Sequence, residues 1–271
     1  MGKSAIVTMV VGDRYRDLWR RLCAPNWRAY ADRHGLDVCV IDDPLDASEL
    51  AQRRGFSWQK LLIGTVDGFR HYDHLIWIDA DIVVNAEAAP SILEGMPPDR
   101  IGAVRYHPLL SQPLLAAAHR RICNGLLPDA FCASSFRRCG LVGDSSQMIQ
   151  GGVLVVPRDL VPVLERIYHK YPQPGSRQLE EQPYLSYELS AAGLTHYLDD
   201  KFNAVWYEYK HGLYLGDQRP DLNRWLVRKV LSDVYFLHFA GNQQDMLLLD
   251  NEDSVLNSGR GDLNDRKPIH G

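Results

Sequence analysis

Two aspartates lie two positions apart inside the apolar stretch HLIWIDADIVV, residues 74–84. An ionised carboxylate is costly to bury unless it is paired or bound to a metal ion. Residues two apart in a strand point to the same side, so Asp79 and Asp81 could share one ion. Hard oxygen ligands suit Mg²⁺ or Mn²⁺ that also contacts a phosphate group. The alternative for an isolated D-x-D is that one aspartate caps a turn and the other forms a surface ion pair.

The chain around these aspartates alternates between strands and helices over its first hundred residues. AIVTMVV, residues 5–11, is short, apolar and β-branched and ends at Gly12-Asp13, which is typical of a buried strand. We also expect strands at 36–42, 74–84 and 101–106, a helical segment at 14–34 that Pro25 interrupts, and a helix at 58–72 with Ser57 as its N-cap. This order predicts an α/β fold with a mostly parallel sheet and helices on both faces. Ligands of such sheets bind at the carboxyl ends of the strands, where the two aspartates would lie.

The rest of the chain is less regular. Residues 107–145 show one helical pattern, at 114–122, and later elements are expected as strands at 148–158, 195–198, 204–209 and 234–239 and as helices at 159–171 and at 179–193, the last ended by Gly193. No repeat or low-complexity linker divides the chain, so we expect a single domain over residues 1–249. Residues 250–271 are polar and rich in Gly, Asn and Asp, which predicts a mobile tail or lid.

Composition narrows the class of protein. Of the 271 residues, 45% are hydrophobic, which is enough for a large core, and the net charge of −4 gives no basic field for nucleic acid. We find no signal-peptide pattern and no apolar run of about 20 residues, so we expect a cytoplasmic protein without a transmembrane segment. The five cysteines are expected as reduced thiols. Cys123, Cys132 and Cys139 cluster, but their spacing fits no common zinc finger.

The D-x-D strand and four further stretches resemble, in chain order, glycosyltransferases of the GT-A fold, and most nearly the retaining families 8 and 34. The further stretches are NWRAYADRHGLDV at 26–38, the helix-plus-strand block at 58–85, QGGVLVVPR at 150–158 and HFAGNQQD at 238–245. Together they cover roughly residues 5–245. The resemblance implies a Rossmann-like, mixed and mostly parallel sheet flanked by helices.

The resemblance also implies an activity: transfer of a sugar from a nucleotide sugar, most simply a UDP-sugar, to an acceptor hydroxyl. Asp79, Asp81 and His238 would hold Mn²⁺ or Mg²⁺ on the diphosphate, and the ion would neutralise the leaving group as a Lewis acid. A histidine ligand favours Mn²⁺. The alternative for His238 is a packed core histidine, because FLHFA is strongly apolar.

Further site residues follow from the resemblance, each beside an ordinary structural alternative. Thr8, Val10 and Asp13 would hold the base and ribose, and Tyr15 would stack on the base; the alternative is a plain strand-to-helix turn. Lys60 would meet the phosphates or the sugar, or would be a surface lysine. The remaining donor-site residues are Ala80, Gln150, Gly151, Gly152 and Gly241, and Asn203 stands where related enzymes often carry a polar residue of the acceptor pocket.

The candidate catalytic pair is Glu181-Gln182 in LEEQPYL, which the resemblance places beside the anomeric carbon and which favours retention of configuration. Its alternative is a solvated helix start, where acids are common. Two positions depart from the family 8 pattern. Gln150 replaces the asparagine of the N-x-G motif, and Gln244 replaces a lysine that follows the H-x-x-G motif and contacts the diphosphate.

Three other readings remain open. IWIDADIVV also fits the motif of haloacid-dehalogenase-type phosphatases, with Asp79 as nucleophile, Asp81 as acid/base and HYLDDK (196–201) as the late acidic pair, although that motif usually lies on the first strand. A sugar nucleotidyltransferase would need a Gly-rich basic loop, whereas GDRYRD has one glycine. A non-catalytic binding module would fail to bind Mn²⁺. The sequence names neither the sugar nor the acceptor, which could be a glycan, a lipid, a protein or a small molecule.

Overall fold

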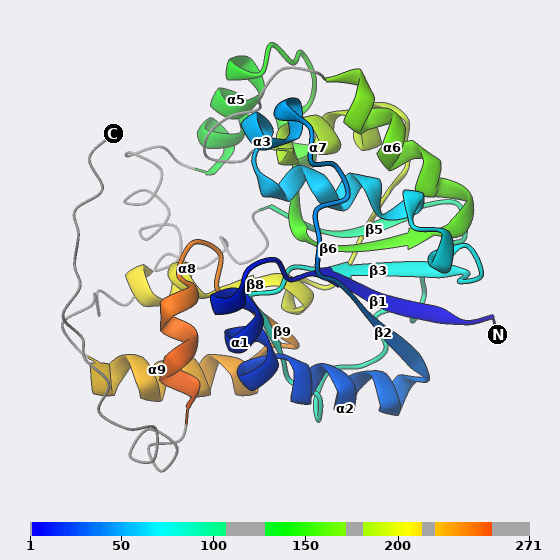
Figure 1. Ribbon diagram of the computed structural model, residues 1–271. Helices are drawn as coiled ribbons and strands as arrows, with labels where there is room; N and C mark the ends of the chain where they lie inside the picture. Colours follow the sequence, from blue (N-terminus) through cyan, green and yellow to red (C-terminus); the bar gives the residue numbers. More distant parts are fainter. Residues whose placement is uncertain (1, 107–127, 172–180, 213–219, 251–271) are drawn as a thin grey trace.

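A six-stranded sheet forms the centre of the molecule (Figure 1). The computed structural model describes residues 2–106, 128–171, 181–212 and 220–250. The sheet has the order β2-β1-β3-β6-β5-β7, with β1 Ser4–Met9, β2 Leu36–Ile41, β3 His74–Ile78, β5 Ile101–Arg105, β6 Ile149–Pro157 and β7 Thr195–Tyr197. Its β2-β1, β1-β3 and β5-β7 pairs are parallel, and β6 is antiparallel to both neighbours. This is the mixed, mostly parallel sheet that the sequence predicts.

Strand alternation gives the sheet two apolar faces, each covered by helices. On one face, Ile6, Ile76 and Val153 pack with α1 (Asp13–Leu22) and α2 (Ala24–His34). On the other, Val7, Trp77 and the remaining alternate residues pack with the 3-10 helix η1 (Phe56–Thr65), α5 (Pro128–Arg138), α6 (Val161–Lys170) and α7 (Gln182–Ala191). Figure 1 shows the two groups of helices on opposite sides of the sheet.

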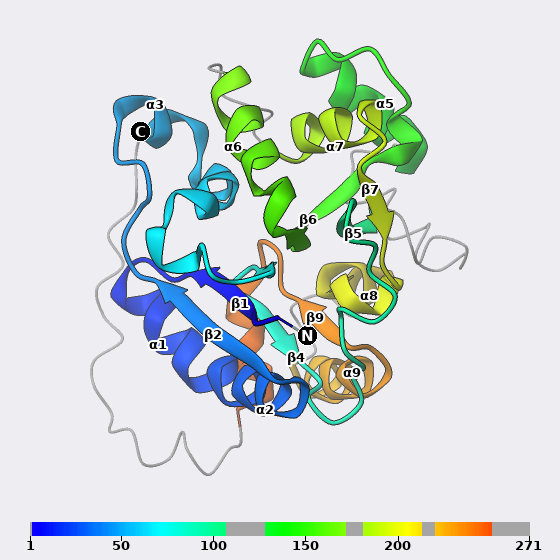
Figure 2. The same cartoon turned by 90° about the vertical axis from the view of Figure 1, so that its right-hand side faces the viewer.

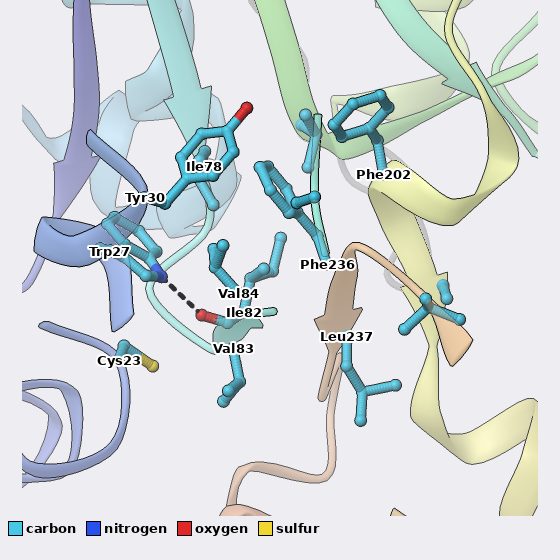
Figure 3. Packing of buried hydrophobic residues seen from close by; sticks show 14 of the residues in the cluster. Cys23, Trp27, Tyr30, Ile78, Ile82, Val83, Val84, Phe202, Phe236 and Leu237 are labelled. Carbon is cyan, nitrogen blue, oxygen red and sulfur yellow. Dashed lines mark hydrogen bonds between the residues drawn. The ribbon is translucent and has the colours of Figure 1, made fainter. Parts of the chain in front are cut away.

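A second, three-stranded sheet adjoins the first, in the order β4-β9-β8. Its strands are β4 (Ile82–Val84), β8 (Ala204–Val205) and β9 (Phe236–His238), and α8 (Trp206–Gly212) and α9 (Pro220–Asp233) lie beside them (Figure 2). Figure 3 shows how α2 is fixed to this sheet: the indole of Trp27 donates to the carbonyl of Ile82 at 2.8 Å. The ring of Tyr30 meets Phe236 edge-on, with centroids 5.4 Å apart.

The remaining described elements are short. They are α3 (Glu49–Arg54) and the 3-10 segments η2 (Asp67–Phe69), η4 (Ser145–Gln147), η5 (Arg158–Leu160), η6 (Asp200–Asn203) and η7 (Gln243–Leu249). Among the described residues no helix is both long and apolar enough to cross a lipid bilayer. The expected helix at 114–122 and the expected tail at 251–271 lie outside the described residues.

The structure corrects four details of the expected elements. The strand expected at 74–84 is broken at residues 79–81, because β4 leaves the large sheet to pair with β9. The helix expected at 58–72 is the 3-10 helix η1; it begins at Phe56 after Gly55 (φ 90°), so Ser57 is not its N-cap. The strand expected at 204–209 ends after two residues and continues as α8. Residues 128–138, expected to be irregular, form α5.

Candidate active site

Three ligand-type side chains meet at the seam between the two sheets. Asp79 follows β3, Asp81 precedes β4, and His238 ends β9 opposite Ile82. One ligand atom from each of the three lies within 4.8 Å of the others, a spacing that would hold one cation. His238 Nε2 is 3.2 Å from Asp81 Oδ1 and 3.8 Å from Asp79 Oδ2. The two aspartates reach this point from a turn rather than from one face of a single strand.

Each of these three side chains has its second polar atom held by a neighbour. The holding contacts are Trp77 Nε1 to Asp79 Oδ1 at 2.6 Å, Gln243 Nε2 to Asp81 Oδ2 at 2.9 Å, and His238 Nδ1 to Asn203 Oδ1 at 2.8 Å. One atom of every ligand residue therefore remains directed at the cluster. Residues that orient metal ligands in this way are a regular part of metal sites.

The electrostatics of the cluster also favour a cation. Burial opposes the charged form of His238, but Asp81 and Asp79 together outweigh it and raise the histidine pKa. Burial likewise opposes the charge on Asp81, but His238 and Gln243 lower its pKa below the usual range. For Asp79, burial dominates and raises the pKa, although Lys60 and His238 act in the opposite direction. Asp79 and Asp81 are partly buried, and the one lysine beside them is shared with Glu181, so a divalent ion would supply the positive charge that His238 alone does not.

Lys60 joins this cluster to the candidate catalytic pair. Its side chain is 2% exposed, and its ammonium group lies 3.1 Å from Asp79 Oδ1, 3.0 Å from Glu181 Oε1 and 2.8 Å from the carbonyl of Gly151. These three contacts use all three ammonium protons. Burial would lower its pKa, but Asp79 and Glu181 raise it. The alternative of a surface lysine is therefore wrong, and the predicted contact of Lys60 with the donor's phosphates or sugar stays a prediction.

Two glycines of β6 make room for these contacts. A Cβ atom at Gly151 would lie 2.6 Å from Glu181 Oε1, and one at Gly152 would lie 2.5 Å from His238 Cε1. Real Cβ atoms do not approach other atoms so closely, so either change would displace a candidate site residue. The predicted importance of both positions has this steric explanation: the backbone of β6 passes directly against the functional side chains.

Two cavities meet at the aspartates. The first, the polar arm, has a volume of 460 Å³ and is lined by Gln150, Gly151, Gly152, Glu181, Gln182 and Tyr106, among others. The second, the apolar arm, has a volume of 390 Å³ and is lined by Met9, Val11, Tyr15, Trp77 and Ala80. Both share a wall made of Phe56, Ser57, Lys60, Asp79 and Asp81. The cation cluster therefore lies where the two arms join.

The polar arm holds its side chains through backbone contacts. Gln182 Oε1 accepts from the Gly151 N–H at 3.3 Å, and Gln150 Nε2 donates to the Tyr106 carbonyl at 3.3 Å. The opposite atoms of the two amides, Gln182 Nε2 and Gln150 Oε1, are enclosed and have no partner in the described part of the chain. Glu181 is 3% exposed, so the alternative of a solvated helix start is wrong for it.

The apolar arm is built differently from the expected one. Met9 and Val11 line it, whereas Thr8 and Val10 face the opposite side of β1, because a shift of one residue along a strand exchanges its two faces. Asp13 lies outside both arms; it is exposed at the start of α1 and pairs with Arg16 at 3.5 Å. Tyr15 lines the arm as predicted, and Ala80 does so beside it.

Three residues of the site were not predicted from the sequence. Trp77 and Gln243 each hold a metal-type ligand, and Phe56 lines both arms. Trp77 and Gln243 lie inside the stretches 58–85 and 238–245, whereas Phe56 lies outside every such stretch. Asn203, predicted at an acceptor pocket, contacts His238 and lines neither arm. Gly241 lines the polar arm with φ 68°, and Gln244 lines a neighbouring cavity of 440 Å³.

Other predicted clusters lie away from the groove. Asp199 and Asp200, the acidic pair of the phosphatase reading, line neither arm; Asp199 caps η6. Cys132 and Cys139 are free thiols, and Cys123 lies outside the described residues. Within residues 2–106, 128–171, 181–212 and 220–250, Asp79, Asp81 and His238 are the one group placed to hold a metal ion.

No protein-family model matches the chain, and no curated protein matches it in sequence. Several solved structures match its fold. A glycosyltransferase involved in glycosylation of the major capsid of PBCV-1 matches 90% of this chain and 100% of its own, with 15% identity and a TM-score of 0.54. The bifunctional glycosyltransferase WbbM matches 94% of this chain and 51% of its own (12% identity, TM-score 0.54). The galactosyltransferase LgtC, in complex with donor and acceptor sugar analogues, matches 93% and 99% (12% identity, TM-score 0.50). The fold is therefore that of the GT-A glycosyltransferases.

Proposed function

We propose that the protein is a metal-dependent glycosyltransferase that moves a sugar from a nucleotide-sugar donor, a UDP-sugar, to an acceptor hydroxyl. The observation that carries this proposal is the position of the cation cluster at the junction of an apolar and a polar arm. The fold shared with glycosyltransferases and the resemblance to families 8 and 34 support it.

The two arms match the two ends of such a donor. An apolar arm with Tyr15 and Phe56 at its rim offers aromatic faces on which a nucleobase can stack. A polar arm with enclosed amide atoms offers partners to the hydroxyl groups of a sugar. The group that joins a nucleoside to a sugar in these donors is a diphosphate. It would lie at the junction, beside the one place in the described chain where a divalent cation fits.

Asp79, Asp81 and His238 would hold Mn²⁺ or Mg²⁺, each through one atom, and three ligands leave room for phosphate oxygens. When bound, the ion supplies Lewis-acid stabilisation of the negative charge on the leaving diphosphate. Trp77, Gln243 and Asn203 keep the ligand atoms in place. The chain thus contributes a preorganised site, which is the main way in which enzymes lower the barrier of a charge-separating step.

The carboxylate Glu181 would act on the sugar. Its Oε1 already accepts from Lys60, and this contact would hold the carboxylate in place beside an oxocarbenium-like centre. Gln182, the next residue, would contact the reacting sugar from the same wall. This arrangement favours retention, so an α-linked donor would give an α-glycoside. We assign the transferase domain to residues 1–249, and the acceptor would be a glycan, a lipid, a protein or a small molecule.

A panel of nucleotide sugars tests the proposal. Each is mixed with the protein and Mn²⁺, and both nucleoside diphosphate release and thermal shift are measured. At least one donor should be hydrolysed or transferred, and excess EDTA should abolish the reaction. Rapid hydrolysis of an aryl phosphate, without use of any nucleotide sugar, would favour the phosphatase instead. Absence of both Mn²⁺ binding and donor turnover would leave a non-catalytic protein of this fold.

A further inference from the structure

Asn203 and His238 form a fully enclosed contact behind the cation cluster. Asn203 is 0% exposed and His238 is 8% exposed, and Asn203 Oδ1 lies 2.8 Å from His238 Nδ1. A carbonyl oxygen can only accept, so this contact requires that Nδ1 carries the ring proton. A neutral imidazole has a single N–H, and the lone pair then belongs to Nε2, the atom that faces Asp79 and Asp81.

The surroundings fix this arrangement. Asn203 ends η6, and the next two residues pair with β9 in register, with Ala204 opposite Leu237 and Val205 opposite His238. Gly152 lies against the edge of the imidazole so closely that a Cβ atom there would be 2.5 Å from Cε1 and 2.7 Å from Nδ1. The ring is therefore held between Gly152 and the β8–β9 pair, and the amide of Asn203 meets only one of its nitrogens.

The other end of the Asn203 side-chain amide is unpaired in the part of the chain that the structure describes. Asn203 Nδ2 is enclosed and has no hydrogen-bond partner within the described residues. An enclosed amide with one unsatisfied end is a costly core residue compared with an apolar side chain of similar volume. The hydrogen bond of its side chain to His238 is the interaction that distinguishes asparagine from such a residue here.

We propose that Asn203 is a positioning residue that fixes the tautomer of His238 and thereby sets the preference of the site for a transition-metal cation over Mg²⁺. The inference rests on the proposed metal-dependent function. An imidazole nitrogen directed at the cluster suits Mn²⁺ and Co²⁺, whereas Mg²⁺ relies on carboxylate and water oxygens. Without the Asn203 acceptor, Nδ1 and Nε2 would compete for the proton, and Nε2 would be available as a ligand for only part of the time.

Metal titrations without nucleotide test this directly. The affinities for Mn²⁺, Co²⁺ and Mg²⁺ are measured by calorimetry, and by electron paramagnetic resonance for Mn²⁺, on the wild type, Asn203→Leu and Asn203→Asp. Asn203→Leu should weaken Mn²⁺ and Co²⁺ binding about 10- to 100-fold, as losses of such supporting residues do, and weaken Mg²⁺ binding much less. Asn203→Asp keeps an acceptor and should retain Mn²⁺ binding. In the metal-free wild type, ¹⁵N spectra recorded above the pKa of His238 should show a neutral ring with its proton on Nδ1.

The controls separate the possible failures. Gln52→Leu changes an exposed amide side chain of α3 that lines neither arm, and it should leave all three affinities unchanged. Unaltered Mn²⁺ binding by Asn203→Leu, equal losses for Mn²⁺ and Mg²⁺, or a neutral His238 whose single proton is on Nε2 would each overturn the inference. If Asn203→Leu does not fold, weak Mn²⁺ binding by a folded Asn203→Asp would overturn it too. A wild type that binds none of the three ions would instead refute the metal site of the proposed function.

Discussion

The polar and apolar arms of the groove achieve their shapes in opposite ways. In the polar arm, Lys60 bridges two carboxylates and Gln182 accepts a hydrogen bond from the backbone of β6. Gly151 and Gly152 lie so close to the site side chains that neither position has room for a Cβ atom. In the apolar arm, Tyr15 and Phe56 stand at the rim with 48% and 47% of their surface exposed. The polar arm is therefore preorganised, which suits the reacting part of a substrate, and the apolar arm offers contact area, which suits binding. Changes in the first should lower turnover, and changes in the second should raise KM.

The largest effect is expected at the junction that both arms share. Asp81→Ala removes one of three cation ligands and the partner of Gln243, so transfer should fall by about 10³-fold or more while the fold is kept. Mn²⁺-dependent transfer, Mn²⁺ affinity and circular dichroism are measured together. Full activity of the wild type in excess EDTA would show that no cation takes part.

Within the polar arm, Glu181→Ala and Gln182→Ala should each lower kcat by about 10²-fold with little change in donor KM, as expected for lost transition-state contacts. Gln52→Ala, an exposed glutamine of α3, is the matched control and should behave as the wild type. The anomeric proton coupling of the product should identify an α-glycoside from an α-linked donor. A β-linked product would exclude retention, and near-normal turnover of both variants would remove the pair from the reaction.

In the apolar arm, Tyr15→Ala should raise donor KM about tenfold at unchanged kcat, because base stacking contributes about 1–3 kcal/mol per base. Val40→Ala changes another exposed apolar residue, 41% exposed on β2, and should leave KM unaltered. A fall in kcat without a change in KM would mean that the two arms do not divide binding from reaction as we infer.

The smallest effect is a pH dependence of metal stabilisation. Because Asp81 and Asp79 outweigh burial and raise the pKa of His238, its protonated form stabilises the metal-free fold at low pH, and this contribution is lost as pH rises through the raised pKa. Mn²⁺ must displace the same proton. The rise in Tm caused by Mn²⁺ should therefore grow by a few degrees between about pH 6 and pH 8. His238→Gln should abolish this dependence, and a rise that is larger at acid pH would contradict it.

Much of the fold could be predicted because its determinants are local. The apolar runs of β1, β2 and β3, the proline in the first turn of α2 and the D-x-D motif are visible in short windows, and they place Asp79 and Asp81 after β3. The register of β1 was not predictable, because AIVTMVV is apolar on both faces and shows no alternation. The sequence therefore predicts Thr8 and Val10 as site residues, whereas Met9 and Val11 line the apolar arm in the structure.

The structural details that the sequence did not predict depend on contacts between residues that are far apart in the chain. The break after Ile78 arises because β4 pairs with β9, whose residues come about 150 positions later. The burial of Lys60 arises from Asp79 and Glu181, and the role of Asn203 arises from His238. Phe56 is a single aromatic residue with no periodic context. Such contacts form only when the chain folds, so no short stretch of the sequence predicts them.

The seam that carries the cation cluster has a mechanical consequence. The backbone N–H of Asp79 bonds to Gly152 in the large sheet, whereas the carbonyl of Asp81 accepts from Phe239 beside the small one. A cation held by both aspartates and His238 would thus act as a cross-link between two sheets that otherwise could open separately. The amide protons of β4 and β9 should then exchange with solvent only as fast as those of β3, so that ion binding joins two units of local unfolding into one.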